Sequence, residues 1–417
     1  MKSGKLFSCI VSIVLLCILL LNLTACLMTS AEDLMEGISP RDVIEVDDFE
    51  SCGADITDFS LRLFKATAEQ EKNTLVSPLS VLYALAMTVN GAEGETLSEM
   101  EGVLGMNAEE VNLYLHSYLE SLPEGENYKL SLANSIWFKG DPFFNVDRDF
   151  LQTNADYYGA DIYKAPFDRS TLRDINSWVK KETDGEITKV LDNIPEDAIM
   201  YLVNALAFEA EWMSIYKNNQ VREGIFTTES GEEQSVDMMY SGEHVYLEDD
   251  NAKGFIKYYK GRKYAFAAIL PDEGITVSEY LNTLDGEGLY SLLSNAESAT
   301  VRAAIPKFET EYSTEMAEVL CKMGMPTAFD PDRADFSGIG NYSSGNIFIN
   351  RVIHKTHIRV DERGTKAGAV TVIEMGKNSA ADPGEIKTVY LDRPFVYMLI
   401  DCENNIPLFI GTTMNVK

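Results

Sequence analysis

The segment 362–371 constrains the fold of this chain more than any other, because it reads as a strand that cannot fold by itself. It follows residues 352–360, an alternating, β-branched run that is typical of a strand. Side chains alternate between the two faces of a strand, so the small residues of the segment share one face. They are Thr365, Ala367, Ala369 and Thr371. This face is small enough to lie between existing strands but offers few apolar anchors. We therefore predict a strand that is held in reserve and can enter a sheet.

Motifs along nearly the whole chain resemble those of one family, the serpins, whose mobile reactive loop inserts into a central sheet. They are Asn-Thr-Leu-Val-Ser-Pro-Leu-Ser from residue 73, Asn-Ser-Trp-Val from 176, Leu-Val-Asn-Ala-Leu-Ala-Phe from 202, Ile-Pro-Lys-Phe from 305, Ala-Asp-Phe-Ser from 334 and Arg-Pro-Phe from 393. Their order and spacing carry the resemblance over residues 55–417. It implies an α+β serpin fold, with mixed central β-sheets surrounded by helices and an exposed reactive-centre loop at about residues 363–392.

The resemblance implies an inhibitor of extracellular serine proteases rather than an enzyme. In the family, a protease attacks the loop as a substrate and forms an acyl-enzyme; the cut loop then inserts and traps the protease in a covalent one-to-one complex. We expect a monomer. The alternative is a non-inhibitory surface protein of the same fold that binds a ligand or partner. The hinge departs from the family's pattern at Lys366, Gly368 and Val370, but alternation places these three side chains away from the core. It favours the inhibitor, because no charge or proline faces inward from Thr365 to Thr371.

The reactive bond is placed by the family's usual spacing from Gly364. That spacing gives Asn378-Ser379, and a loop cut one residue earlier gives Lys377-Asn378, which we favour. Two further positions stay open because the loop is long: Met375 and Ala380-Ala381. Lys377 would suit the acidic pocket of trypsin-like proteases, whereas Asn378 would suit subtilisin-like proteases.

By the same resemblance, a polar cluster lies under the centre of the sheet, where strands part to admit the loop. Its members are Ser77, Ser80, Asn204 and His354. Buried polar side chains need partners, and a hydrogen-bonded set can hold strands together yet re-form after they separate. Trp212 and Glu362 match the family's upper opening, where the loop first enters. The alternative is that His354 and Trp212 are ordinary core residues.

The start of the chain predicts where the protein works. Lys2 and Lys5 precede an apolar run over residues 6–21 that is short for a membrane span, and Leu-Thr-Ala-Cys then ends at Cys26. Residues 1–25 read as a signal peptide with the lipobox of bacterial lipoproteins, whose cysteine is lipidated and becomes the mature N-terminus. We expect an extracellular protein anchored to the cell membrane through Cys26. Ordinary secretion with cleavage near Ala25 and an uncleaved anchor are the alternatives.

Residues 26–54 are rich in acidic side chains and show little apolar periodicity. This composition predicts a solvated tether between the membrane and the domain, with an additional N-terminal helix as the alternative.

Charge and composition exclude several functions. The net charge is −31, and removing the signal peptide with its two lysines makes it more negative still. Such a surface repels nucleic acid and anionic lipid, so membrane attachment would depend on acyl chains. Of the six cysteines, only Cys52, Cys321 and Cys402 follow residue 26, and no Cys-x-x-Cys pair, metal motif or catalytic motif occurs. His354 and His357 face opposite sides of their strand, so we expect neither a metal nor a cofactor.

Local patterns predict individual elements. Ile56, Phe59 and Leu63 recur at helical spacing; Ser77 and Pro78 begin a helix that has no polar face. Further predictions are a capping box at Thr96 and Glu99, a strand at 132–138, a helix through 175–179 ended by Gly185, and hairpins at 255–270 and 395–412.

Overall fold

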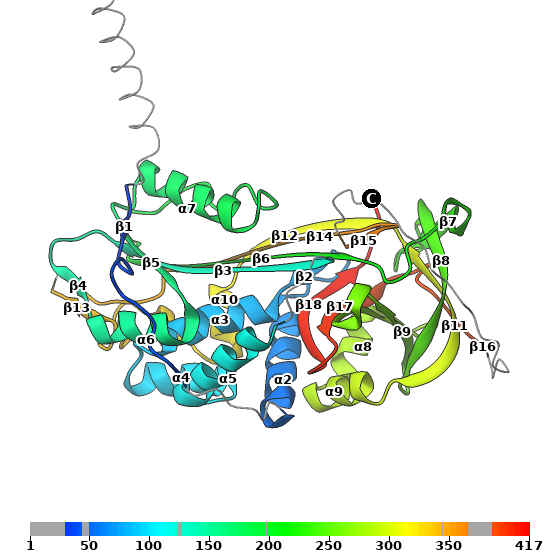
Figure 1. Ribbon diagram of the computed structural model, residues 1–417, viewed down its shortest axis with the longest axis horizontal. Coiled ribbons are helices and arrows are strands. Elements are labelled where there is room, and N and C mark those ends of the chain that lie inside the picture. The colour runs from blue at the N-terminus through cyan, green and yellow to red at the C-terminus, as the bar shows by residue number, and fades with distance from the viewer. Residues whose placement is uncertain (1–29, 44–49, 123–126, 197, 344, 366–385) are drawn as a thin grey trace, which may run out of the picture.

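The computed structural model describes residues 30–43, 50–122, 127–196, 198–343, 345–365 and 386–417. Large mixed sheets are surrounded by helices (Figure 1), so the predicted α+β architecture is confirmed. The predicted signal peptide, Cys26 and residues 366–385 lie outside the described residues.

The central sheet has seven strands within the described residues, in the order β1-β5-β3-β6-β15-β14-β12. Their bounds are β1 (Glu32–Asp33), β5 (Asp161–Ala165), β3 (Tyr128–Lys139), β6 (Met200–Glu211), β15 (Gly364–Thr365), β14 (Arg351–Val360) and β12 (Phe308–Glu315). The strands predicted at 132–138 and 352–360 are β3 and β14. β6 and β14 run parallel, and β15 lies antiparallel to both. This arrangement sets the site described below.

A second sheet follows the order β16-β11-β8-β9-β10-β17-β18-β2, with β7 paired to β8. Its strands are β16 (Ile386–Tyr390), β11 (Glu297–Pro306), β8 (Glu233–Glu248), β9 (Ala252–Tyr258), β10 (Tyr264–Pro271), β17 (Phe395–Asp401), β18 (Ile406–Thr413), β2 (Thr74–Val76) and β7 (Val221–Thr227). The pairs β9–β10 and β17–β18 confirm the two predicted hairpins. A small ladder joins β4 (Phe144–Val146) to β13 (Gly340–Tyr342).

Helices cover both faces of the central sheet. The α-helices of the described residues are α2 (Glu50–Thr67), α3 (Pro78–Val89), α4 (Gly94–Leu104), α5 (Ala108–Ser121), α6 (Arg148–Tyr158), α7 (Arg169–Glu182), α8 (Val277–Thr283), α9 (Gly286–Ser294) and α10 (Ala317–Met323). In Figure 1, α7 lies on one face of the sheet, and α3 to α6 lie on the other. Helix α3 begins as predicted, because Ser77 caps it and Pro78 occupies its first turn; every residue of α3 is buried. Helix α7 ends at Glu182, and Gly185 adopts a φ of 87° just beyond it.

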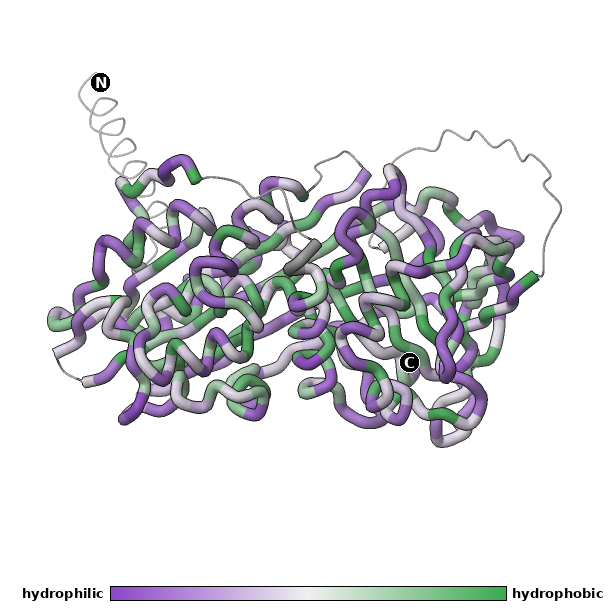
Figure 2. Tube along the Cα trace, turned by 90° about the horizontal axis from the view of Figure 1, so that it is seen from below, coloured by the Kyte–Doolittle hydropathy of each residue, from purple (hydrophilic) through white to green (hydrophobic). Residues whose placement is uncertain are grey.

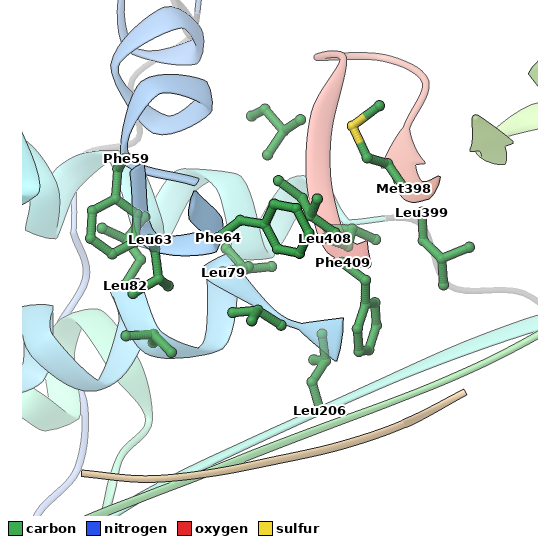
Figure 3. Close-up of a cluster of buried hydrophobic side chains, with 14 of the residues drawn as sticks. Phe59, Leu63, Phe64, Leu79, Leu82, Leu206, Met398, Leu399, Leu408 and Phe409 are labelled. Atoms are coloured by element: carbon green, nitrogen blue, oxygen red, sulfur yellow. The ribbon is translucent and has the colours of Figure 1, made fainter. Parts of the chain in front are cut away.

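The hydrophobic core lies between the two sheets and the first helices. Figure 3 shows apolar side chains of α2, α3 and β18 meeting beside Leu206 of β6. They include Phe59, Leu63, Phe64, Leu79, Leu82, Leu206, Leu408 and Phe409. Figure 2 shows hydrophilic and hydrophobic residues interleaved along the helices and strands, as expected of elements with one buried face.

The predicted capping box at Thr96 and Glu99 is wrong. Helix α4 begins earlier, at Gly94, and its N-cap Glu93 makes no side-chain capping bond. The Thr96 hydroxyl instead accepts a hydrogen bond from the backbone amide of Asp335, and Glu99 accepts bonds from the amide and hydroxyl of Thr327. Both side chains therefore bind a loop distant in sequence, which local spacing cannot reveal.

The prediction of a solvated tether is wrong for residues 30–43, which lie against the domain. β1 pairs with the edge strand β5, and the Arg41 side chain contacts the Asp156 carboxylate on α6 at 2.6 and 2.9 Å. Leu34, Met35 and Ile38 pack against the core. The free backbone groups at the edge of the sheet and this small apolar cluster hold an acidic segment that shows no periodicity.

The boundary predicted at residue 55 also differs, because α2 begins at Glu50. Across the described ranges, no helix has the length and hydrophobicity needed to cross a membrane.

Candidate functional site: a hinge strand at the opening of the central sheet

The central sheet opens between β6 and β14. The two strands pair directly from Arg351 with Tyr201 to Thr356 with Leu206. Beyond that point they diverge, and β15 occupies the space between them, with Thr365 opposite both Ala210 and Val360. The first residues of the segment predicted as a reserve strand are thus already in the sheet.

Gly364 and Thr365 fit this opening closely. A Cβ at Gly364 would meet the Ala210 carbonyl oxygen at 2.0 Å, so only glycine allows the hinge to approach β6 so closely. Thr365 is 1% exposed, and its hydroxyl forms a hydrogen bond with the Tyr259 hydroxyl. Its side chain therefore points into the protein, on the face that alternation predicts for the small residues.

A turn before β15 is fixed at the mouth of the opening. The Glu362 carboxylate forms an ion pair with the Lys307 ammonium at 2.8 Å, and this hydrogen bond lowers the pKa of Glu362. The Tyr216 amide donates to the Glu362 carbonyl at 2.9 Å, and the Trp212 amide donates to the Arg363 carbonyl at 2.8 Å. Backbone and side-chain bonds together hold the hinge in one position.

Trp212 forms the floor of the opening. It is fully buried, its ring stacks on Tyr259 with centroids 4.4 Å apart, and its Nε1 donates to the Asp361 carbonyl at 2.9 Å. The buried Lys257 ammonium lies 5.4 Å from the Trp212 ring and pairs with Glu243 at 2.8 Å. Opening the hinge further would therefore disturb an aromatic and ionic cluster.

A second polar cluster joins β6, β14 and α3 below the opening. His354 Nδ1 is hydrogen-bonded to Asn204 Oδ1, which also accepts a bond from the Ser80 hydroxyl at 3.3 Å. His354 Nε2 accepts a bond from the Ser77 amide at 3.1 Å, so the proton lies on Nδ1. The cluster therefore bridges directly between the two strands that part above it.

Burial keeps His354 neutral. The imidazole is fully buried, and desolvation lowers its pKa to about 3. The Nδ2 of Asn204 and both polar atoms of Asn134, its neighbour across β3 and β6, have no hydrogen-bond partner within the described part of the chain. These groups retain capacity for new hydrogen bonds if the strands separate.

The structure brings together Ser77, Ser80, Asn204 and His354 in the lower cluster, and Trp212, Glu362, Gly364 and Thr365 at the opening. The remaining site predictions lie outside the described residues: Cys26, Ala367, Ala369, Thr371, Lys377, Asn378 and Ser379. His354 is buried, whereas His357 on the other face binds Glu309 at 2.9 Å, so their predicted opposition is confirmed. No cluster of three potential metal ligands occurs in the described ranges.

Sequence analysis missed several participants. Lys307 lies in the Ile-Pro-Lys-Phe motif, which supplied a family resemblance but no role for the lysine. Asn134 is a polar residue within an apolar strand, and this pattern is a usable signal. Tyr259 and Lys257 meet Trp212 only through the fold of the second sheet, so their spacing gave no indication.

The chain is similar to known proteins over most of its length. A family model described as Serpin (serine protease inhibitor) matches residues 54–416. The uncharacterized serpin-like protein TK1782 of Thermococcus kodakarensis is 31% identical over 370 residues, covering 87% of this chain and 85% of that protein. The human leukocyte elastase inhibitor is 28% identical over 379 residues, covering 85% of this chain and 97% of that protein.

Solved structures distinguish two conformations. The thermophilic serpin tengpin in its native state has a TM-score of 0.88 at 48% identity, covering 93% of this chain and all of that one. Tengpin in its latent state has a TM-score of 0.80 at 47% identity, covering 90% of this chain and all of that one. The described structure is thus more similar to the native state than to the latent state.

Proposed function

Because the chain belongs to the serpin family, we propose that it inhibits extracellular serine proteases as a suicide substrate. The observation that carries the proposal is β15, a two-residue strand that lies between β6 and β14 where these strands diverge. The start of the proposed reactive loop therefore already lies between these two strands, and the rest of the loop would continue the strand that it begins.

The proposed reaction begins as ordinary proteolysis. The protease serine attacks a carbonyl of the loop, the peptide bond breaks to release the amine of the next residue, and an ester joins the serine to the residue before the cut. The segment from Gly364 to that residue then has one free end, which carries the protease. We propose that this segment extends β15 between β6 and β14 and displaces the protease before water cleaves the ester.

Energetics support this direction. An inserted loop would gain on the order of ten ladder hydrogen bonds at ~0.5–1.5 kcal/mol net each, and would bury small side chains. Insertion must separate the lower pairs between β6 and β14 and break the contact between His354 and Asn204. These losses are few, and the unpartnered amides of Asn134 and Asn204 can form new hydrogen bonds.

The finer details are also part of the proposal. We propose Lys377-Asn378 as the reactive bond, with Asn378-Ser379 as the alternative, and trypsin-like or subtilisin-like proteases as targets. We further propose a monomer that acts outside the cell, attached to the membrane by lipid on Cys26.

The test is incubation with trypsin-like, elastase-like and subtilisin-like proteases, followed by denaturing electrophoresis. We expect a one-to-one complex that survives SDS, and mass spectrometry of the released C-terminal peptide to identify the bond. A protease whose catalytic serine is replaced by alanine is the matched control and should give no covalent complex. Loop cleavage without any complex would overturn the proposal and favour a non-inhibitory serpin that binds a ligand or partner.

A further inference from the structure

A hollow of about 470 Å³ lies on the second sheet, far from the lower polar cluster. Strands β7, β8, β11 and β16 contribute to its lining, which includes Arg222, Tyr240, Gly242, Arg302 and Tyr390. These strands lie together at one end of the molecule (Figure 1). None of the described residues that line the hollow is acidic, although the chain carries a net charge of −31. Its size is in the range of small-molecule sites.

Two arginines in the hollow have no acidic partner among the residues that the structure describes. The Arg302 side chain is exposed and makes no hydrogen bond or ion pair with any residue that the structure describes, although its backbone is paired with β8 and β16. Arg222 donates from Nε to the Asn219 carbonyl at 3.2 Å, and its guanidinium lies 5.5 Å from the centre of the Tyr240 ring. Arg222 has no carboxylate partner among the described residues. As far as the described residues go, most of the donors of both guanidiniums are therefore available to an anion.

Gly242 keeps the space between these groups open. It lies directly opposite Arg302 across β8 and β11. A Cβ at this position would meet no atom within 4 Å, and the backbone is not in the left-handed region. Neither crowding nor conformation requires glycine here. The missing side chain instead leaves room beside Arg302.

Aromatic rings form the apolar part of the hollow. Tyr240 and Tyr390 meet edge to face, with ring centroids 5.7 Å apart. Tyr390 is 37% exposed, so part of its ring is available to a ligand. Guanidinium groups bind planar or tetrahedral oxyanions through paired donors, and an adjacent ring favours a ligand with a planar body.

We propose that this hollow binds a small oxyanion carried on a planar body, with Arg222 and Arg302 as the anion-binding residues. Aryl phosphates, aryl sulfates and aryl carboxylates share this chemistry. The site is independent of the protease-trapping function proposed above, because none of these residues belongs to the hinge or to the lower cluster.

The test is isothermal titration of the full chain with phenyl phosphate, phenyl sulfate, benzoate and inorganic phosphate at constant ionic strength. We expect one-to-one binding of at least one aryl anion, at higher affinity than inorganic phosphate, and the preferred head group identifies the ligand source. Binding of none of the aryl anions at millimolar concentration would overturn the proposal. Equal affinity for phenyl phosphate and inorganic phosphate would overturn the role of the planar body.

Variants separate specific binding from general attraction. Arg302→Gln and Arg222→Gln should each weaken binding about tenfold or more, because each removes charge-assisted hydrogen bonds. Arg173→Gln removes the same charge from an exposed position on α7 and should leave binding unchanged. Gly242→Leu keeps both arginines but fills the hollow, so it should abolish binding in a protein that unfolds at the wild-type temperature. Wild-type affinity in both Arg302→Gln and Gly242→Leu would refute the site.

Discussion

At the scale of single residues, Thr365 is the position where burial tests insertion. Its side chain is 1% exposed and contacts Tyr259, so an arginine there would bury a charge without a partner, at a cost of several kcal/mol. We expect Thr365→Arg to be cleaved by the target protease but to give little SDS-stable complex. Thr365→Ser keeps a small hydroxyl side chain and should inhibit like the wild type. An unchanged yield of complex in Thr365→Arg would contradict insertion along this face.

His354 predicts a pH dependence of stability. Its pKa in the folded protein is lowered to about 3 by burial, whereas the unfolded imidazole titrates near its ordinary value of about 6.5. Below the unfolded pKa, the unfolded state binds more protons, so this group removes up to about 1.4 kcal/mol of stability per pH unit as the pH falls. His354→Gln stays neutral and should lose less stability.

The measurement is the denaturant midpoint of wild type and His354→Gln at pH 7.5, 6.5 and 5.5. Asp and Glu titrations are common to both proteins, so the difference between the two curves isolates the histidine. Parallel curves over this range would show that the imidazole is not buried neutral.

The residue patterns identified several members of the site, but they did not predict which residues contact one another. Ser77, Asn204 and His354 came from a resemblance, and the structure brings them within hydrogen-bonding distance. Tyr259 and Lys257 were not identified, because their contacts with Trp212 join strands of the second sheet to the end of β6. Such contacts depend on how the sheets pack, which no local pattern encodes.

At the scale of elements, the segment 30–43 should detach when its main ionic contact is removed. Arg41 makes three hydrogen bonds to the Asp156 carboxylate, and these lower the pKa of that group despite the opposing effect of desolvation. Arg41→Gln should speed hydrogen exchange at Leu34, whose amide donates to Ile162 on β5. Exchange in α3 should not change.

The control for this prediction is Arg148→Gln, which removes the same charge from α6, the helix that carries Asp156, and leaves the segment unchanged. Equal exchange at Leu34 in Arg41→Gln and the wild type would mean that strand pairing and the apolar cluster hold the segment without the ion pair.

Elements defined by short-range patterns were predicted well, and those that depend on distant partners were not. The serine cap of α3 and the β9–β10 hairpin follow from adjacent residues. Thr96 has the right spacing for a cap, yet its hydroxyl binds a loop more than two hundred residues away. Residues 30–43 show no periodicity that would predict a strand. Their structure depends on the pairing of β1 with the edge of β5, which the local sequence does not reveal.

At the scale of the whole molecule, Cys26→Ser tests the proposed anchor. Cys26 precedes the described part of the chain, so the variant should keep the folded domain and its inhibition but leave the membrane. Stable attachment needs at least two acyl chains, which a lipoprotein's diacylglyceryl group would supply. Partition between membrane fraction and medium, with metabolic labelling by a fatty acid, is the measurement. If the wild-type protein carried no fatty acid label and appeared in the medium, the anchor would be ruled out and ordinary secretion would be the correct interpretation.

The last prediction concerns the stability that the proposed loop insertion would add to the whole molecule. In the described structure the hinge contributes only two residues to the central sheet, whereas insertion would complete a strand between β6 and β14. About ten further ladder bonds at ~0.5–1.5 kcal/mol each would raise the melting temperature by roughly 10 °C or more. Calorimetry of intact and loop-cleaved protein measures this rise. Cleaved Thr365→Arg is the matched control, because its loop is cut but cannot enter, so its melting temperature should stay near that of the intact variant. If cleaved wild type also showed no rise, the loop would remain outside the sheet, no insertion would be available to displace a protease, and the non-inhibitory alternative would follow.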